Sequence, residues 1–207
     1  AKEAVRRRPL WADATAVEAL YESRRSAYAQ CDLRLEGDVD PQETARRILE
    51  YYGNHGELEA RHGSVSCPVI PTYEAAAAVA TRVAGRRVAL LTDRTVAREH
   101  LERYRQALPG AEEIVVPPGE RSKSFKGLQT LYRALLEAQF GRDDVLVCLG
   151  GGMVTDLGAF AASTYKRGMP FILVSTSLLG CVDAAVGGKA AVNFESAKNQ
   201  IGLFTEP

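Results

Sequence analysis

From residue 64 onward, short apolar runs alternate with segments whose apolar residues recur at helical spacing. The runs cover residues 88–91, 114–116 and 145–149, with helices expected through about Leu108 and over residues 124–138. Continuous apolar strands are typical of strands buried on both faces, so this alternation predicts an α/β fold with a parallel sheet. Ligands bind such sheets at the carboxyl ends of their strands, which directs attention to the turns that follow them.

The first part of the chain has a different pattern. Two segments with helical periodicity flank residues 31–37, where polar and apolar residues alternate as in a strand. Asp40 and Pro41 predict an N-cap and first turn of a helix of about twelve residues that ends near Gly53. We therefore expect residues 1–52 to be the tail of an α/β domain. Residues 53–63 are polar and predict a linker, and residues 64–207 form the next domain.

Composition narrows the class of protein. The 207 residues include 46% hydrophobic and 25% charged residues, which excludes a disordered chain. Lys plus Arg (26) equals Asp plus Glu (26), so no overall basic field favours nucleic acid or an anionic membrane. No apolar run is long enough to cross a bilayer. The start at Ala1 and the end at Pro207 lead us to expect a fragment.

The four cysteines predict reduced thiols. Cys31, Cys67, Cys148 and Cys181 are widely spaced and form no C-x-x-C pair, so neither a disulfide framework nor a zinc site is indicated. Together with the absence of an apolar spanning run, this leads us to expect a cytoplasmic protein.

A glycine turn follows the third apolar run. Leu149 and the triplet 150–152 precede an apolar helix that contains Asp156. Glycines let backbone N–H groups approach a pyrophosphate at the positive end of the helix, although a tight turn without a ligand is an equal alternative. The triplet departs from G-x-G-x-x-G, which excludes the simplest dinucleotide fingerprint but not a dinucleotide.

Two other strand ends carry polar residues. Asp93 ends the first run, where a carboxylate can bind ribose hydroxyls or cap a helix. The loop 117–123 has a fixed turn and charges of both signs, and a solvated loop is the alternative. Further along, Asp183, Lys189, Lys198 and Asn199 stand among small residues, which suggests an anion-accepting pocket, although surface lysines are commoner.

At these residues the sequence resembles 3-dehydroquinate synthase, of the sugar-phosphate cyclase group. The matching motifs are P-P-G-E-x-x-K at 117–123, L-G-G-G-x-x-x-D at 149–156, T-Y-x-R-G at 164–168, V-D-x-x-V-G-G-K at 182–189 and K-N-x-I-G at 198–202. The departures, at Thr155, Ser175, Ser177 and Ala197, bear on details of the cofactor loops. The resemblance covers residues 64–207 and implies a Rossmann-like domain of this family, without its helical C-terminal domain.

The resemblance implies a reaction and a set of roles. The family converts 3-deoxy-D-arabino-heptulosonate 7-phosphate to 3-dehydroquinate and phosphate, with NAD oxidising the substrate transiently. It assigns NAD binding to Asp93, Gly119, Glu120, Lys123, Gly151, Gly152, Asp156, Thr176, Ser177, Lys189 and Lys198. It assigns the catalytic and substrate contacts to Asp183, Lys189, Lys198, Asn199 and Arg167, of which Arg167 reaches a phosphate bound by the neighbouring subunit of a homodimer.

The resemblance also implies a divalent metal, zinc or cobalt. In the family a glutamate and two histidines of the C-terminal domain hold it. The three histidines here, His55, His62 and His100, precede the glycine turn and match none of those ligands. We therefore expect the metal ligands to lie outside this chain and the chain to be inactive alone.

The first 50 residues resemble the end of shikimate kinase, with Arg8 matching its lid arginine and Arg24 a shikimate-binding arginine. No P-loop is present, Gly37 and Asp38 stand where some kinases have another arginine, and an amphipathic basic helix is the alternative. This resemblance implies a parent that fuses shikimate kinase to the synthase.

Three alternatives stay open. A valiolone-type synthase would act on another sugar phosphate. An iron-dependent alcohol dehydrogenase or glycerol dehydrogenase shares the G-G-G-x-x-x-D pattern but lacks the V-D-x-x-V-G-G-K and K-N motifs. A nucleotide-binding regulatory module would not need Asp183, Lys189 and Lys198 together.

Overall fold

The computed structural model describes residues 14–28, 40–53, 57–62, 65–186 and 188–207. Contacts divide the chain into two compact units, Ala1–Asn54 and His55–Pro207. Each unit is considered by itself. None of the helices in the described ranges combines the length and the hydropathy needed to cross a bilayer.

The first unit contains helices α2 (Ala14–Tyr28) and α3 (Pro41–Gly53). An Asp40 carboxylate oxygen accepts a hydrogen bond from the backbone N–H of Glu43 at 3.1 Å, so Asp40 caps α3. The helix predicted from Asp40 to Gly53 is therefore confirmed. The strand predicted over residues 31–37 lies outside the described residues.

The second unit begins with an antiparallel pair that the sequence analysis placed partly in a linker. Strand β1 (Leu58–His62) pairs with β2 (Val65–Val69), with Leu58 opposite Val69. Residues 58–62 of the expected linker thus form a strand, and the assignment of residues 53–63 as a linker between two domains stays a prediction. Polar side chains obscured the strand, because the backbone hydrogen bonds that stabilise it come from β2 and not from its own sequence.

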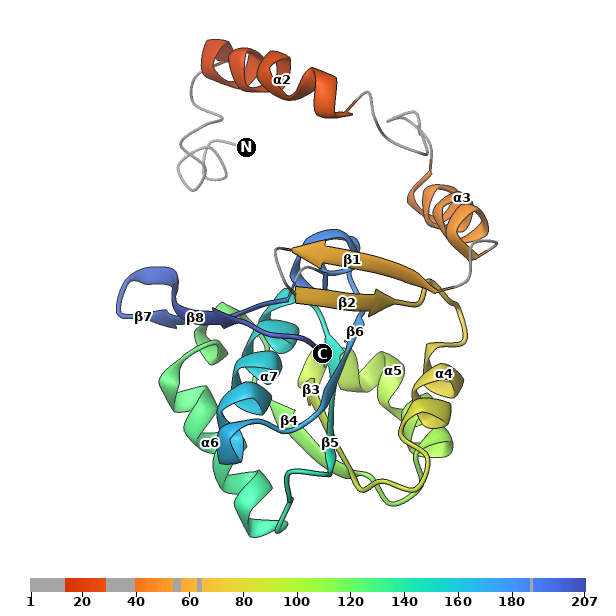
Figure 1. Cartoon of the computed structure of the whole chain (residues 1–207), viewed down its shortest axis with the longest axis vertical. Coiled ribbons are helices and arrows are strands. Elements are labelled where there is room, and N and C mark those ends of the chain that lie inside the picture. The colour runs from red at the N-terminus through yellow and green to blue at the C-terminus, as the bar shows by residue number, and fades with distance from the viewer. Residues whose placement is uncertain (1–13, 29–39, 54–56, 63–64, 187) are drawn as a thin grey trace. The chain divides into compact units, whose positions relative to one another are not determined.

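The central feature is a parallel sheet of four strands, as predicted. Its strands are β3 (Val88–Asp93), β4 (Glu112–Val116), β5 (Val145–Gly150) and β6 (Phe171–Ser175), in the order β4-β3-β5-β6 (Figure 1). The chain passes from β3 to β4 at one side and then returns to β5 on the other side of β3. The sheet therefore has a switch point between β3 and β5, where α/β sheets bind ligands.

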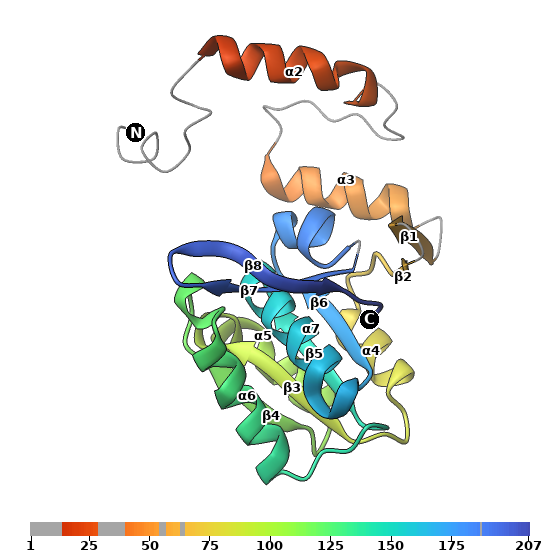
Figure 2. The same ribbon diagram turned by 60° about the vertical axis from the view of Figure 1, so that its left-hand side comes forward.

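Helices cover both faces of this sheet (Figure 2). On one face lie α4 (Ala75–Arg82) and α5 (Arg94–Ala107), and on the other lie α6 (Phe125–Glu137) and α7 (Gly152–Thr164). Successive side chains of a strand point to opposite faces of the sheet, so neighbouring residues pack against different pairs of helices. Leu90 packs with α4 and α5, whereas Leu91 packs with α6 and α7, and both are almost fully buried.

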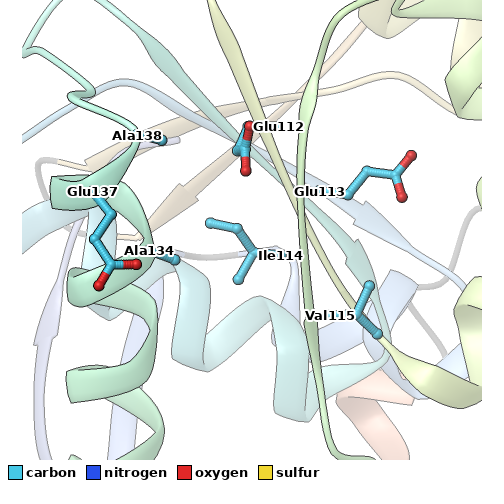
Figure 3. Close-up of a pocket in the computed structure, with 7 residues that line it drawn as sticks. All are labelled: Glu112, Glu113, Ile114, Val115, Ala134, Glu137 and Ala138. Carbon is cyan, nitrogen blue, oxygen red and sulfur yellow. The ribbon is translucent and has the colours of Figure 1, made fainter.

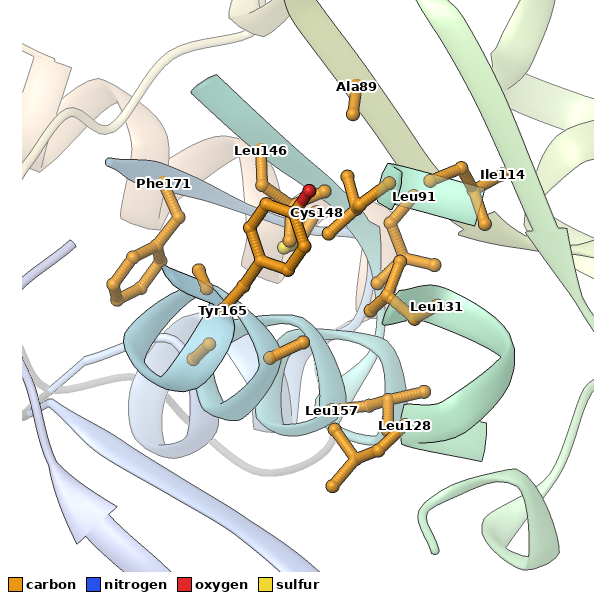
Figure 4. Close-up of a cluster of buried hydrophobic side chains, with 14 of the residues drawn as sticks. Ala89, Leu91, Ile114, Leu128, Leu131, Leu146, Cys148, Leu157, Tyr165 and Phe171 are labelled. Atoms are coloured by element: carbon orange, nitrogen blue, oxygen red, sulfur yellow. The ribbon is translucent and has the colours of Figure 1, made fainter. Parts of the chain in front are cut away.

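The larger core lies between the sheet and helices α6 and α7 (Figure 4). Gly158 of α7 permits the close approach of this helix, because a Cβ atom there would stand 2.2 Å from the Cys148 sulfur of β5. Leu128, Leu131 and Leu157 complete the layer with no more than 1% of their surface exposed. The packing thus fixes α7, and with it the glycine turn at its start.

Beyond β6 the chain forms elements that the sequence analysis did not predict. A short helix, η4 (Gly180–Ala184), is followed by the antiparallel hairpin of β7 (Lys189–Phe194) and β8 (Ala197–Phe204). Ala190 and Val192 of β7 are buried in the core shared with α7. This hairpin carries the lysine and asparagine motifs onto the α7 layer.

Candidate functional site

The turns predicted to bind a ligand lie along one edge of the parallel sheet. Asp93 is in register with Val116, and Gly150 is in register with Ser175. The segments that follow these strands therefore leave from the same edge. They carry Asp93, the Gly119 loop, the glycine turn and Thr176, which the sequence placed at four separate positions.

The glycine turn leads into a helix whose N-terminus is not capped by a side chain. Asp93 caps α5 and Ser124 caps α6, but Gly151 at the start of α7 offers no capping group. A Cβ atom at Gly151 would stand 3.4 Å from the Ser177 hydroxyl, and one at Gly152 would stand 3.3 Å from Ala184. The turn thus leaves backbone N–H groups and the positive end of α7 available to an anion.

Thr176 and Ser177 hold the neighbouring turn against the glycines. The Thr176 N–H donates to the Gly150 carbonyl at 3.0 Å, and the Ser177 hydroxyl accepts from the Gly180 N–H at 3.2 Å. Both residues are exposed. Their position beside Gly151 agrees with the grouping predicted from sequence.

Asp93 acts as a helix cap in the structure. One of its carboxylate oxygens accepts from the Thr95 N–H at 2.7 Å and from the Val96 N–H at 3.1 Å, and the residue is 8% exposed. The helix-cap alternative weighed from sequence is therefore confirmed. A role toward ribose stays a prediction.

Lys123 is the most deeply buried charged residue among the predicted site residues. Only 3% of it is exposed, and its ammonium donates to the carboxylate of Asp156 on α7 and to the side-chain carbonyl of Asn199 on β8. Burial raises the pKa of the Asp156 carboxyl above its ordinary value, and the Lys123 ammonium opposes that rise. Three motifs far apart in the chain thus meet at one ammonium group.

Asp183 and Lys189 form a second ion pair. The Lys189 ammonium lies 2.5 Å from an Asp183 carboxylate oxygen, and both side chains are about half exposed (53% and 55%). Solvent screens such a pair, so its attraction is weak and Lys189 is free to exchange partners. Lys198, on the adjacent strand β8, is also exposed.

The structure does not place the predicted arginines with the other predicted site residues at the carboxyl ends of the strands. Arg167 precedes β6, at the amino end of the strands, and lines a separate hollow with Ser163, Thr205 and Glu206. It has a left-handed backbone conformation with φ of 68°. Arg24 is exposed on α2 in the first unit, and Arg8 lies outside the described residues.

Another hollow lies beside the edge strand β4 (Figure 3). Its lining includes Glu112, Glu113 and Glu137 but none of the residues predicted for the site. The charged side chains in its lining are all glutamates, and the lining comes from β4, α6 and the residue after α6. It is therefore not the site assembled by the motifs.

Sequence reasoning missed Asn193. Its side chain contacts both Glu120 and Asn199, in the loop after β4 and in β8. No chemical motif marks this residue, and the hairpin that carries it was not predicted, so nothing in the sequence pattern pointed to it. Among the described residues no group of three or more His, Cys, Asp or Glu side chains is arranged to hold a metal ion.

Comparison with known proteins connects this geometry to one family. Residues 113–207 match the family described as 3-dehydroquinate synthase N-terminal. Over 133 residues the chain is 46% identical to the 3-dehydroquinate synthases of Brucella ovis and Brucella abortus, which covers 62% of this chain and 35% of those proteins. The chain thus spans about a third of the length of these curated relatives.

Solved structures show the same fold. A 2-deoxy-scyllo-inosose synthase complexed with carbaglucose-6-phosphate, NAD+ and Co2+ superposes with a TM-score of 0.65 at 20% identity, over 73% of this chain and 44% of that one. A 2-epi-5-epi-valiolone synthase from Streptomyces hygroscopicus subsp. jinggangensis with NAD+ and Zn2+ bound gives 0.59 at 28% identity, over 72% and 42%.

Proposed function

We propose that the full-length protein is a 3-dehydroquinate synthase, because residues 113–207 match the model of that family's N-terminal domain. It converts 3-deoxy-D-arabino-heptulosonate 7-phosphate to 3-dehydroquinate and phosphate. The observation that carries this proposal is the uncapped α7 N-terminus beside the Lys123, Asp156 and Asn199 cluster. The helix end can bind an anion, and the cluster places charged side chains beside it. Both lie at the carboxyl ends of the strands, near the switch point between β3 and β5.

The residues at this edge fit NAD. Gly151 and Gly152 leave the α7 N-terminus open to a pyrophosphate, where a Cβ atom would lie in close contact with Ser177 or Ala184. We propose that NAD is held by Asp93, Gly119, Glu120, Lys123, Gly151, Gly152, Asp156, Thr176, Ser177, Lys189 and Lys198. When bound, NAD accepts a hydride from the substrate carbinol and returns it, so no net oxidation results.

The exposed cations suit the substrate. Transient oxidation of the carbinol to a ketone acidifies the neighbouring C–H, so loss of that proton and of the phosphate group forms a double bond. Lys189 is paired only weakly with Asp183 and can move to the departing phosphate dianion. We propose that Lys198 and Asn199 on β8 hold the substrate between Lys189 and the Lys123 cluster. After the ketone has been reduced again, the opened enol closes to the carbocycle of 3-dehydroquinate.

Arg167 suggests a second subunit. It lies at the amino end of the strands, away from the other proposed catalytic residues. We propose that it reaches the substrate phosphate of the neighbouring subunit in a cytoplasmic homodimer. An Arg167→Ala variant that retained NAD affinity but lost affinity for the sugar phosphate would agree with this role.

The described residues do not supply the metal site. They contain no group of three or more His, Cys, Asp or Glu side chains that could hold a metal ion. We propose that its ligands lie in the part of the protein that the relatives have beyond this chain. The kinase role of the first unit also stays a prediction.

A valiolone-type synthase is the second candidate. The Streptomyces structure of that type is 28% identical and carries NAD+ and Zn2+. Both candidates share the hydride cycle, so they are separated by substrate. The full-length protein can be offered the heptulosonate phosphate and, separately, a heptulose 7-phosphate that retains its 3-hydroxyl. Turnover of the first substrate alone favours 3-dehydroquinate synthase. Turnover of the second substrate alone excludes it.

Two experiments test the proposal. Isothermal titration of the 207-residue chain should show NAD binding that is lost in Gly151→Val, where the new side chain meets Ser177, and retained in Gly141→Ala, outside the site. In the full-length protein, Lys189→Ala should nearly abolish phosphate release, while Lys126→Ala, an exposed lysine on α6, should not. Normal turnover in Lys189→Ala would contradict the assigned role, and absence of NAD binding would contradict the proposal as a whole.

A further inference from the structure

Asn193 lies where the β7–β8 ladder is interrupted. The register shifts between Val192 and Phe194, so the intervening residue leaves the regular pairing of the hairpin. Its backbone N–H instead donates to the Lys123 carbonyl at 2.9 Å, and it forms an isolated parallel bridge with Ser124. The bulge thus attaches the hairpin to the segment that follows β4.

The side chain of Asn193 extends this attachment in two directions. Its amide nitrogen donates to a Glu120 carboxylate oxygen at 2.9 Å, and its carbonyl oxygen accepts from the Asn199 backbone N–H at 3.0 Å. Because a carboxylate only accepts and a backbone N–H only donates, this pair of partners fixes the orientation of the amide. A residue with only donors or only acceptors cannot make both bonds.

These contacts close a ring with the buried ammonium. Lys123 donates through its side chain to Asn199, Asn199 donates through its backbone to Asn193, and Asn193 donates through its backbone to Lys123. Asn199 has a left-handed backbone conformation, with φ of 55°. The ring therefore holds Asn199 in a conformation that is unfavourable for most residues, with its side chain toward Lys123.

We propose that Asn193 is a positioning residue that couples the Glu120–Lys123 loop to the Lys198–Asn199 segment of the hairpin. Through it, occupation of the nucleotide loop orders the residues that contact the substrate. The consequence for binding rests on the proposed function. The coupling itself rests only on the hydrogen bonds.

A second hairpin contact provides a matched control. Phe194, the next residue, packs edge-on against Phe125 of α6, with ring centroids 6.0 Å apart. Phe194→Leu loosens this contact between the hairpin and α6 but removes no atom that takes part in the hydrogen bonds of Asn193. If Asn193 only docked the hairpin, the two variants would behave alike.

Amide hydrogen exchange of the full chain without nucleotide is the test. Asn193→Ala should speed exchange on the order of tenfold at Asn199 and in the loop 120–123 together. Phe194→Leu should leave the loop unchanged. Unchanged exchange at either segment in Asn193→Ala, or equal effects of the two variants, would overturn the proposal.

A polarity swap keeps the test decisive even if Asn193→Ala does not fold. Asn193→Asp places a carboxylate against Glu120 and should uncouple the loop. Adding Glu120→Gln restores one donor facing one acceptor, so the double variant should recover most of the protection lost in Asn193→Asp. A merely structural role predicts no such recovery, and its absence would overturn the proposal.

NAD then separates this inference from the proposed function. Added NAD should slow exchange at Asn199 in the unmodified chain and have less than half that effect in Asn193→Ala. If the unmodified chain does not bind NAD, the proposed function fails, while the nucleotide-free comparison still decides the role of Asn193. If NAD binds and protects Asn199 equally in both, the coupling is disproved.

Discussion

At the scale of single residues, the site depends on a buried ion pair. Lys123 is almost inaccessible, and Asp156 shows the effect of burial as a raised pKa. Removing one partner of such a pair leaves the other charge without compensation, which costs more than the net contribution of the intact pair. The pair thus makes the stability of the domain sensitive to pH.

Lys123→Met should lower the free energy of unfolding by roughly 3 kcal/mol at pH 7. The folded pKa of Asp156 is raised, so the stability associated with its protonated form is present below the unfolded pKa and lost as pH rises through the folded pKa. Without Lys123 the folded pKa of Asp156 should rise further, so more stability should be lost between low and neutral pH. Urea unfolding between pH 4 and pH 8 measures how the free energy of unfolding depends on pH. Lys126→Met, at an exposed lysine, is the control. Equal pH dependence in both variants would contradict the assignment.

The cysteines should differ in reactivity. Burial raises the pKa of the Cys148 thiol, which is fully enclosed, and also that of Cys67, whereas Cys181 is exposed. Because only the thiolate reacts, iodoacetamide at pH 8 should alkylate Cys181 at least tenfold faster than the other two. Peptide mass spectrometry before and after unfolding in guanidinium measures the rates, and rapid labelling of folded Cys148 would disagree with this packing.

At the scale of elements, one glycine controls how closely α7 approaches the sheet. A Cβ atom at Gly158 would collide with Cys148 and stand 3.0 Å from Leu91. The position of α7 in turn places both the glycine turn and Asp156. Packing of this helix therefore sets the geometry of the site.

Gly158→Ala should destabilise the domain by about 1–3 kcal/mol, because overpacking against Cys148 outweighs the gain of about 1 kcal/mol in helix propensity. Gly141→Ala is the control, since its Cβ would meet only Asp144 at an ordinary 3.5 Å. Thermal unfolding of the full chain measures both changes. A more stable Gly158→Ala variant would show that the layer can relax.

At the scale of the whole molecule, the chain has two units, and every proposed synthase residue lies in the second. Among the described residues of that unit, two hydrophobic clusters are formed by the parallel sheet, its helices and strand β7. The unit therefore has a core of its own. This separates the synthase interpretation from the first unit.

A chain of residues 55–207 should unfold cooperatively and bind NAD within about twofold of the affinity of the full chain. The expectation follows from its complete core and from the position of all proposed NAD contacts within it. Calorimetry and titration of both chains measure it. A tenfold weaker affinity in the shorter chain would show that the first unit supports the site.

The amino-acid sequence alone predicted the parallel strands, the helices between them and the sheet edge at which the candidate site lies. Continuous apolar runs such as residues 145–149 require burial on both faces, and the motifs at the strand ends then fall on one edge because the strands are parallel. The position of Asp93 at a strand end also indicated its cap role as one of two possibilities. These are local patterns or direct consequences of sheet topology.

The folded structure was needed to find strand β1, the β7–β8 hairpin and the partners of Lys123. Lys123 and Asn199 are 76 positions apart, and neither the burial of the ammonium nor the bulge at Asn193 has a local signature. Such contacts form because the chain returns across α7, and the return is stabilised by side chains from several elements at once. Residue type indicated which chemistry was available, and long-range packing decided which groups meet.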